Sequence, residues 1–110
     1  MEISSRDEGE VKVVEVEGNL DTNTSPKAQE HLNGLVSEGS SKILINFAKL
    51  NYISSAGLRI LLATAKQLRA NGGDLRLCSL NQGVQDVFEI SGFSSILSVH
   101  ATEAGALDGF

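Results

Sequence analysis

Hydrophobic and polar residues follow one another along the chain in short blocks, and each block has the period of a strand or of a helix. Apolar residues at alternate positions, rich in β-branched side chains, predict strands, whereas apolar residues three and four apart predict amphipathic helices. The strand pattern is found over residues 3–6, 11–17, 42–47, 75–78 and 96–99. The helical pattern is carried by residues 28–36, 58–68, 84–90 and 102–107.

The helix boundaries have recognisable start and stop signals. Ser25 is expected to cap the first helix and Pro26 to occupy its first position, where a missing N–H group costs nothing. Gly39 is expected to stop this helix, and the segment 71–73 (Asn-Gly-Gly) to stop the long second one.

The order of these elements indicates the fold class. Strands and helices alternate from Lys42 onward, which predicts parallel strands joined by right-handed helical crossovers. The run 42–47 is almost continuously apolar, as expected for a central strand that is covered on both faces. With 110 residues, 41% of them hydrophobic, the chain is expected to be a single domain spanning 1–110 with an α/β fold.

The charges argue against nucleic acid as a partner. Fourteen Asp and Glu against nine Lys and Arg give a net charge of −5, so the chain lacks the basic surface that phosphate backbones require. Seven of the acids lie in the first 21 residues, whereas the segment 39–73 holds five cations and no acid. This basic middle is either a set of solvated helix faces and strand ends or a surface that meets an anionic partner.

Two further observations bear on where the protein acts. No apolar stretch reaches the roughly 20 residues that a membrane-spanning helix needs. Cys78 is the single cysteine, and Met1 leads directly into a polar segment without the pattern of a secretory signal. We therefore expect a cytoplasmic protein with no membrane span.

The candidate chemistry lies at Ser54 and Ser55, just before the long helix. A helix N-terminus has free N–H groups and a positive dipole end, so one serine can cap the helix while the other carries a phosphate. Arg59, one turn further on, is either an ordinary exposed side chain or a partner for that phosphate.

Three motifs in register resemble the STAS domain, and specifically the bacterial anti-sigma factor antagonists. The segment 50–59 (LNYISSAGLR) is similar to the family signature, 18–21 (GNLD) to its Gly-x-Leu/Ile-Asp motif, and 43–46 (ILIN) to its central strand. The resemblance covers nearly the whole chain. It implies a mixed sheet of four to five strands with a mainly parallel core and helices packed largely on one face.

The resemblance also implies a function. In the family, the serine at the position of Ser55 is phosphorylated by a serine kinase that is also the anti-sigma factor. The unphosphorylated antagonist sequesters this kinase and frees the sigma factor, and a separate phosphatase resets the serine. ATP and Mg²⁺ belong to the kinase, so no cofactor is expected on this chain. The expected partner-binding residues are Asp21, Ser54, Ser55, Ala56, Gly57 and Arg59.

Two departures from the family pattern leave alternatives open. Ser54 and Asn46 stand where the family often has Asp, and both changes remove negative charge that we expect to lie next to the acceptor. Ser54 is itself an alternative acceptor, although Ser55 keeps the family spacing to Gly57. The runner-up function is an accessory or scaffold STAS module of a regulatory or transport complex that is never phosphorylated.

An enzyme is not expected. The chain has no G-x-S-x-G motif that would make Ser55 a nucleophile, and its two histidines, His31 and His100, are in a predicted helix and near the chain end. Neither has a cysteine or a second histidine at the spacing of a metal site, so no metal is expected.

Overall fold

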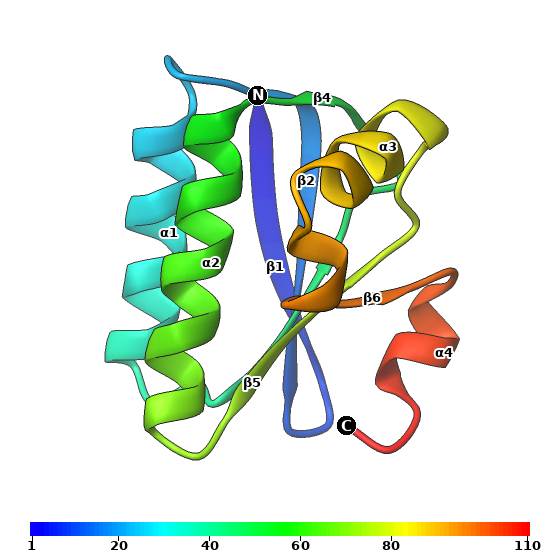
Figure 1. Ribbon diagram of the computed structural model, residues 1–110. Helices are drawn as coiled ribbons and strands as arrows, with labels where there is room; N and C mark the ends of the chain where they lie inside the picture. The colour runs from blue at the N-terminus through cyan, green and yellow to red at the C-terminus, as the bar shows by residue number, and fades with distance from the viewer.

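The computed structural model describes all 110 residues and contains a six-stranded sheet with four α-helices and one 3-10 helix (Figure 1). The strands are β1 (Glu2–Glu8), β2 (Val11–Leu20), β3 (Lys42–Asn46), β4 (Leu50–Ile53), β5 (Asp74–Cys78) and β6 (Ser98–His100). The helices are α1 (Ser25–Ser37), α2 (Ser55–Ala70), α3 (Gln82–Ile90), the 3-10 helix η1 (Phe93–Ser95) and α4 (Glu103–Leu107).

The sheet has the order β1-β2-β3-β5-β6, and β4 pairs with β2 beyond the end of β3. β1 is antiparallel to β2, and every other pair is parallel. The prediction of a mixed, mainly parallel α/β sheet with 42–47 at its centre is therefore confirmed.

The strand count of four to five is too low because β4 was not predicted. Its two end residues, Leu50 and Ile53, are buried and the two between them are exposed, so its pattern does not alternate. β4 exists because β2 is ten residues long, whereas β3 covers only the part of β2 from Lys12 to Glu15. The end of β2 is left free, and after a register shift at Gly18 it takes β4 as a parallel neighbour.

The two faces of the sheet are covered unequally. The larger core lies between the sheet and the helices α1, α2 and α3, and it includes Val14, Ile45 and Leu77. The smaller core lies on the other face, where Ala106 of α4 packs with Val13 and Cys78. Most helices thus share one face, as predicted, and only the short α4 covers the other (Figure 1).

Some predicted boundaries shift. Ser25 is the first residue of α1 and Pro26 the second, so Ser25 is not the cap: its buried hydroxyl donates to the carbonyl oxygen of Asp21. The last strand begins two residues later than predicted because Ile96 ends the turn of η1. The predicted stop at Gly39 is confirmed by its left-handed backbone, with φ of 97°.

The C-terminal helix α4 is held by polar contacts as well as by its small core. Arg6 of β1 donates to Glu103 over 2.6 Å, and this hydrogen bond is the main reason why the pKa of Glu103 is lowered and that of Arg6 is raised. The guanidinium of Arg76 donates to the carbonyl oxygens of Ala106 and Asp108 and lies over the ring of Phe110 at 4.3 Å.

Candidate functional site

The two serines of the candidate site have different roles at the start of α2. Ser54 lies between β4 and the helix, where its N–H donates to the carbonyl oxygen of Leu20 over 2.9 Å. Its hydroxyl accepts from the N–H of Gly57 over 3.3 Å, so Ser54 is the N-cap of α2. Ser55 is the first helical residue; its side chain is exposed and makes no hydrogen bond within the chain.

The start of α2 is electrostatically suited to an anion. No acidic residue lies in its first turn. Ser54 takes up the N–H of Gly57, and the N–H groups of Ser55 and Ala56 find no acceptor within the chain. The free N–H donors and the positive end of the helix dipole both favour a negative charge at the N-terminus of α2.

Asp21 lies at the same edge of the sheet, because Leu20 pairs with Ile53 and the next residues of both strands enter the two helices. Its carboxylate accepts from the N–H groups of Asn23 and Thr24 over 2.9 and 3.0 Å. The hydrogen bond from Thr24 is the largest cause of the lowered pKa of Asp21, and that from Asn23 adds to it. The carboxylate therefore shapes the turn before α1 and stays ionised at neutral pH.

Gly57 has a structural role that differs from the one expected. The family resemblance implies a partner-binding role for Gly57, but Gly57 is buried and faces inward. A Cβ atom would lie 2.8 Å from Ile53 and 2.9 Å from Leu20, both closer than van der Waals contact allows. Glycine is thus required so that α2 can start tightly against the ends of β2 and β4.

Ala56 and Arg59 border a groove between the N-terminal turns of α1 and α2. Arg59 is exposed, and Ala56 is half-buried. The sequence did not predict the α1 side of this groove, which includes Pro26 and Gln29. The feature that could have predicted the α1 side is the parallel pairing of two strands that are each followed by a helix. Such a pair brings the starts of both helices to the same end of the sheet.

Asn46 does not lie next to the acceptor, contrary to expectation. It pairs with Glu15 in the sheet, whereas Ile53 pairs with Leu20, five residues further along β2. At ~3.3 Å per residue this is a separation of about 17 Å. Its amide nitrogen instead donates to Glu103 of α4 over 3.1 Å, and its amide oxygen accepts from the N–H of Ala48.

Asn46→Asp is therefore expected to loosen α4 and leave the serine site unchanged. Aspartate keeps the bond to Ala48 but loses the one donated to Glu103, so unfolding in urea at pH 7 should become easier by about 1–2 kcal/mol. The pKa of Glu103 is lowered from its ordinary value of 4.5, so the ionised carboxylate stabilises the fold above that pH, and this contribution is lost as the pH falls through the folded value.

The difference in the free energy of unfolding between wild type and Asn46→Asp should accordingly shrink below pH 4. Asn51→Asp is the matched control, because Asn51 is exposed and its side-chain amide makes no hydrogen bond; only its backbone carbonyl accepts one, from Asn81. Equal loss of stability in both variants would refute the proposed contact with Glu103.

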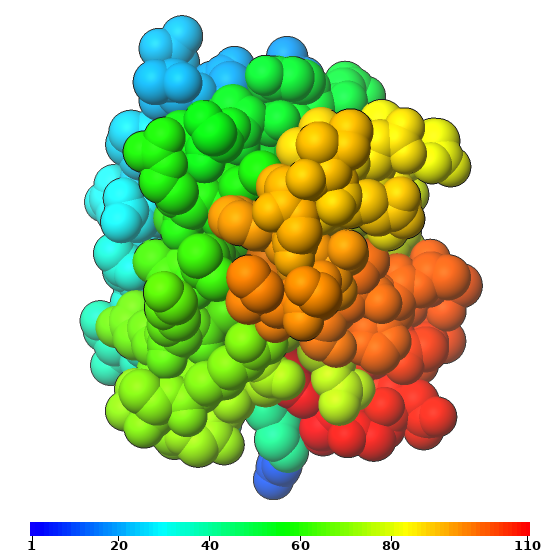
Figure 2. Space-filling view, in the orientation of Figure 1, coloured from blue at the N-terminus to red at the C-terminus, as the bar shows by residue number.

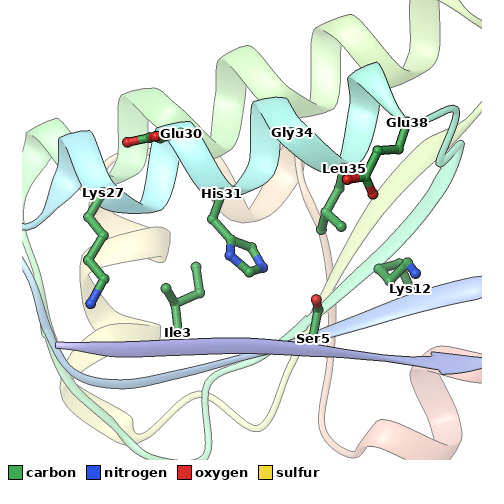
Figure 3. A pocket seen from close by; sticks show the side chains of 9 residues that line it. All are labelled: Ile3, Ser5, Lys12, Lys27, Glu30, His31, Gly34, Leu35 and Glu38. Carbon is green, nitrogen blue, oxygen red and sulfur yellow. The ribbon is translucent and has the colours of Figure 1, made fainter.

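The two histidines do not contribute to the serine site. His31 reaches from another face of α1 into a separate groove against β1, beside Ile3 and Ser5 (Figure 3). His100 shares a hydrogen bond with Ser98 in β6. No group of three or more His, Cys, Asp or Glu side chains is placed to hold a metal ion.

Comparisons with known proteins agree with this geometry. The sequence profile of the STAS domain matches residues 2–106. BtrV of Bordetella bronchiseptica, named as a candidate anti-sigma factor antagonist, is 39% identical over 95 residues, which are 86% of this chain and 82% of BtrV. The anti-sigma-B factor antagonist of Staphylococcus aureus is 30% identical over 87 residues, 79% of this chain and 81% of that protein.

Solved structures show the same fold. The candidate anti-sigma factor antagonist TM1081 of Thermotoga maritima has a TM-score of 0.91 at 18% identity and covers 96% of this chain and 92% of its own. The Bacillus cell fate determinant SpoIIAA, solved in its phosphorylated form, has a TM-score of 0.75 at 24% identity and covers 97% of both chains.

The chain belongs to the STAS domain family. Within that family it is one of the anti-sigma factor antagonists, as its relatives and the serine motif indicate. These are regulatory binding proteins. No helix of the structure combines the length and the apolar character needed to cross a membrane.

Proposed function

We propose that this anti-sigma factor antagonist is a switch whose binding to a serine-kinase anti-sigma factor is controlled by phosphorylation of Ser55. The observation that carries the proposal is that the two serines have different structural roles. Ser54 is committed to capping α2, which leaves the exposed hydroxyl of Ser55 free to react. The phosphorylated form of SpoIIAA, which shares this fold, supports it.

The replacement of the usual Asp by Ser54 is compatible with such a switch. Aspartate and serine are both good N-caps, so the start of α2 is preserved while one negative charge is removed from the neighbourhood of Ser55. The change from Asp to Ser54 therefore leaves the proposed acceptor, Ser55, in place. The experiments below distinguish the switch from the scaffold function.

In the proposed reaction the kinase supplies ATP and Mg²⁺. The oxygen of Ser55 attacks the γ-phosphorus of ATP, the bond to the β-phosphate oxygen breaks, and ADP leaves. A base of the kinase takes the hydroxyl proton. The product carries a charge of about −1.5 to −2 at pH 7, which opposes binding by desolvation and repulsion in a close interface. A separate phosphatase hydrolyses the phosphoserine and restores the binding form.

Phosphoryl transfer to defined variants tests the acceptor. Each serine-kinase anti-sigma factor encoded in the same genome is purified singly and incubated with the chain and Mg·ATP, and the products are identified by intact-mass and tandem mass spectrometry. Wild type and Ser54→Ala should each gain one phosphate, whereas Ser55→Ala should gain none.

Circular dichroism provides the control, because loss of the cap in Ser54→Ala costs about 1 kcal/mol and should leave the chain folded. Phosphate on Ser54, or a kinase that binds the chain without modifying it, would contradict the proposal and favour the scaffold function.

A further inference from the structure

The groove between α1 and α2 is the concave part of the surface next to Ser55. It has a volume of about 380 Å³ and lies between the first turns of the two helices, which run side by side (Figure 1). α1 contributes Pro26 and Gln29, and α2 contributes Ala56, Arg59, Ile60 and Ala63.

The groove is continuous with the phosphorylation site along one face of α2. Ser55, Arg59 and Ala63 follow one another at intervals of four residues, and all three are exposed. In the space-filling view α2 forms a green strip between the cyan α1 and the yellow-to-orange segment of α3 and η1 (Figure 2). A partner that contacts Ser55 from outside therefore also covers the groove.

The charges of the groove are one-sided. No carboxylate lines it, and Arg59 makes no ion pair or side-chain hydrogen bond within the chain. In contrast, Arg69 on the same helix is paired with Asp74 over 2.8 Å. The only charged side chain of the groove is thus a cation that lacks an anion.

The walls determine what kind of side chain fits. Ala56, Ile60 and Ala63 of α2 present aliphatic surface, and Ile60 itself is buried, whereas Ser25 and Gln29 make the α1 side partly polar. A purely apolar side chain would desolvate Arg59 without a partner, and a lysine would be repelled by it. A carboxylate on an aliphatic stem satisfies both parts, because the stem packs on the walls and the carboxylate pairs with the guanidinium.

We propose that this groove receives a glutamate side chain of the anti-sigma factor, whose carboxylate pairs with Arg59; this inference rests on the function proposed above. It also gives phosphorylation a local target. A phosphate on Ser55, four residues before Arg59, competes for the same guanidinium and repels the incoming carboxylate.

Isothermal titration with the kinase identified above tests the groove. Arg59→Glu should weaken binding about 30-fold or more, and Ala63→Gln, which fills the groove without changing charge, should weaken it about tenfold. Lys66→Glu is the matched control: Lys66 is also an exposed cation of α2 but lies outside the groove, and its variant should stay within about threefold of wild type. Arg59 and Ala63 are both exposed, so the variants should unfold at the wild-type urea concentration.

The possible outcomes separate this inference from the proposed function. If wild type binds and Ser55→Asp does not, while Arg59→Glu and Lys66→Glu are equal, the groove does not take a glutamate and the switch stands. If Arg59→Glu weakens binding but Ala63→Gln does not, the pairing occurs outside the groove and the inference is wrong. If wild type binds no kinase of the genome, both proposals fail.

Discussion

Replacing Ser55 with aspartate is expected to weaken binding to the anti-sigma factor at least about a hundredfold, whereas Ser55→Ala should stay within about threefold of wild type. The hydroxyl is exposed and unbonded, so neither change disturbs the fold. A carboxylate at this position must lose water when the partner covers it, and it repels the carboxylate that the partner is proposed to bring to Arg59. It also lies one turn from Arg59, which the partner is proposed to use. Isothermal titration measures both affinities.

Ser41→Asp is the matched control for the added charge. Ser41 is exposed and precedes β3, at the opposite edge of the parallel strands from Ser55. This variant should bind like wild type. Ser55→Asp, Ser55→Ala and Ser41→Asp should all unfold at the same urea concentration as wild type. Equal affinities of Ser55→Asp and Ser41→Asp would show that the start of α2 is not the controlled surface.

Replacing Gly57 with valine is expected to lower the free energy of unfolding by about 2–3 kcal/mol, because the new side chain overpacks the core between α2 and the strand ends. Its Cβ atom alone would meet Ile53, Leu20 and the carbonyl oxygen of Leu20 at 2.8 to 3.0 Å. Relief of these clashes must move the first turn of α2 and stretch the cap bond from Gly57 to Ser54. Urea unfolding followed by circular dichroism measures the loss.

Gly34→Ala distinguishes this clash from a general effect of helical glycine. Gly34 lies within α1, and a Cβ atom there meets nothing within 4 Å. Alanine should therefore stabilise the protein by about 0.5–1 kcal/mol through its higher helix propensity. A Gly57→Val protein as stable as wild type would contradict the inward packing of this glycine.

Much of the fold could be predicted because its elements carry periodic patterns. The central strand is nearly all apolar, and the spacing of Leu58, Leu61, Ala65 and Leu68 defines the stripe by which α2 packs on the sheet. Leu62, which the same pattern includes, is only half-buried. β4 escaped prediction because it is four residues long and owes its existence to the length of β2. Such a strand is defined by its neighbour, and its own sequence does not show it.

The candidate site was predictable in part. The serine motif and the helix start were visible, but the sequence does not distinguish the capping serine from the free one. That distinction depends on the extended backbone of Ser54. The inward direction of Gly57 and the distance of Asn46 from Ser55 depend on how β2 pairs with two different strands in succession. The α1 side of the groove depends on the same pairing.

The most direct test of the Ser55 switch is tandem mass spectrometry of the protein from its native cells, with the pool bound to the anti-sigma factor and the free pool analysed separately. The switch predicts phosphate on Ser55 in the free pool and an unmodified Ser55 in the bound pool. Equal phosphate on Ser55 in both pools, or none in either under growth and stress conditions, would contradict it.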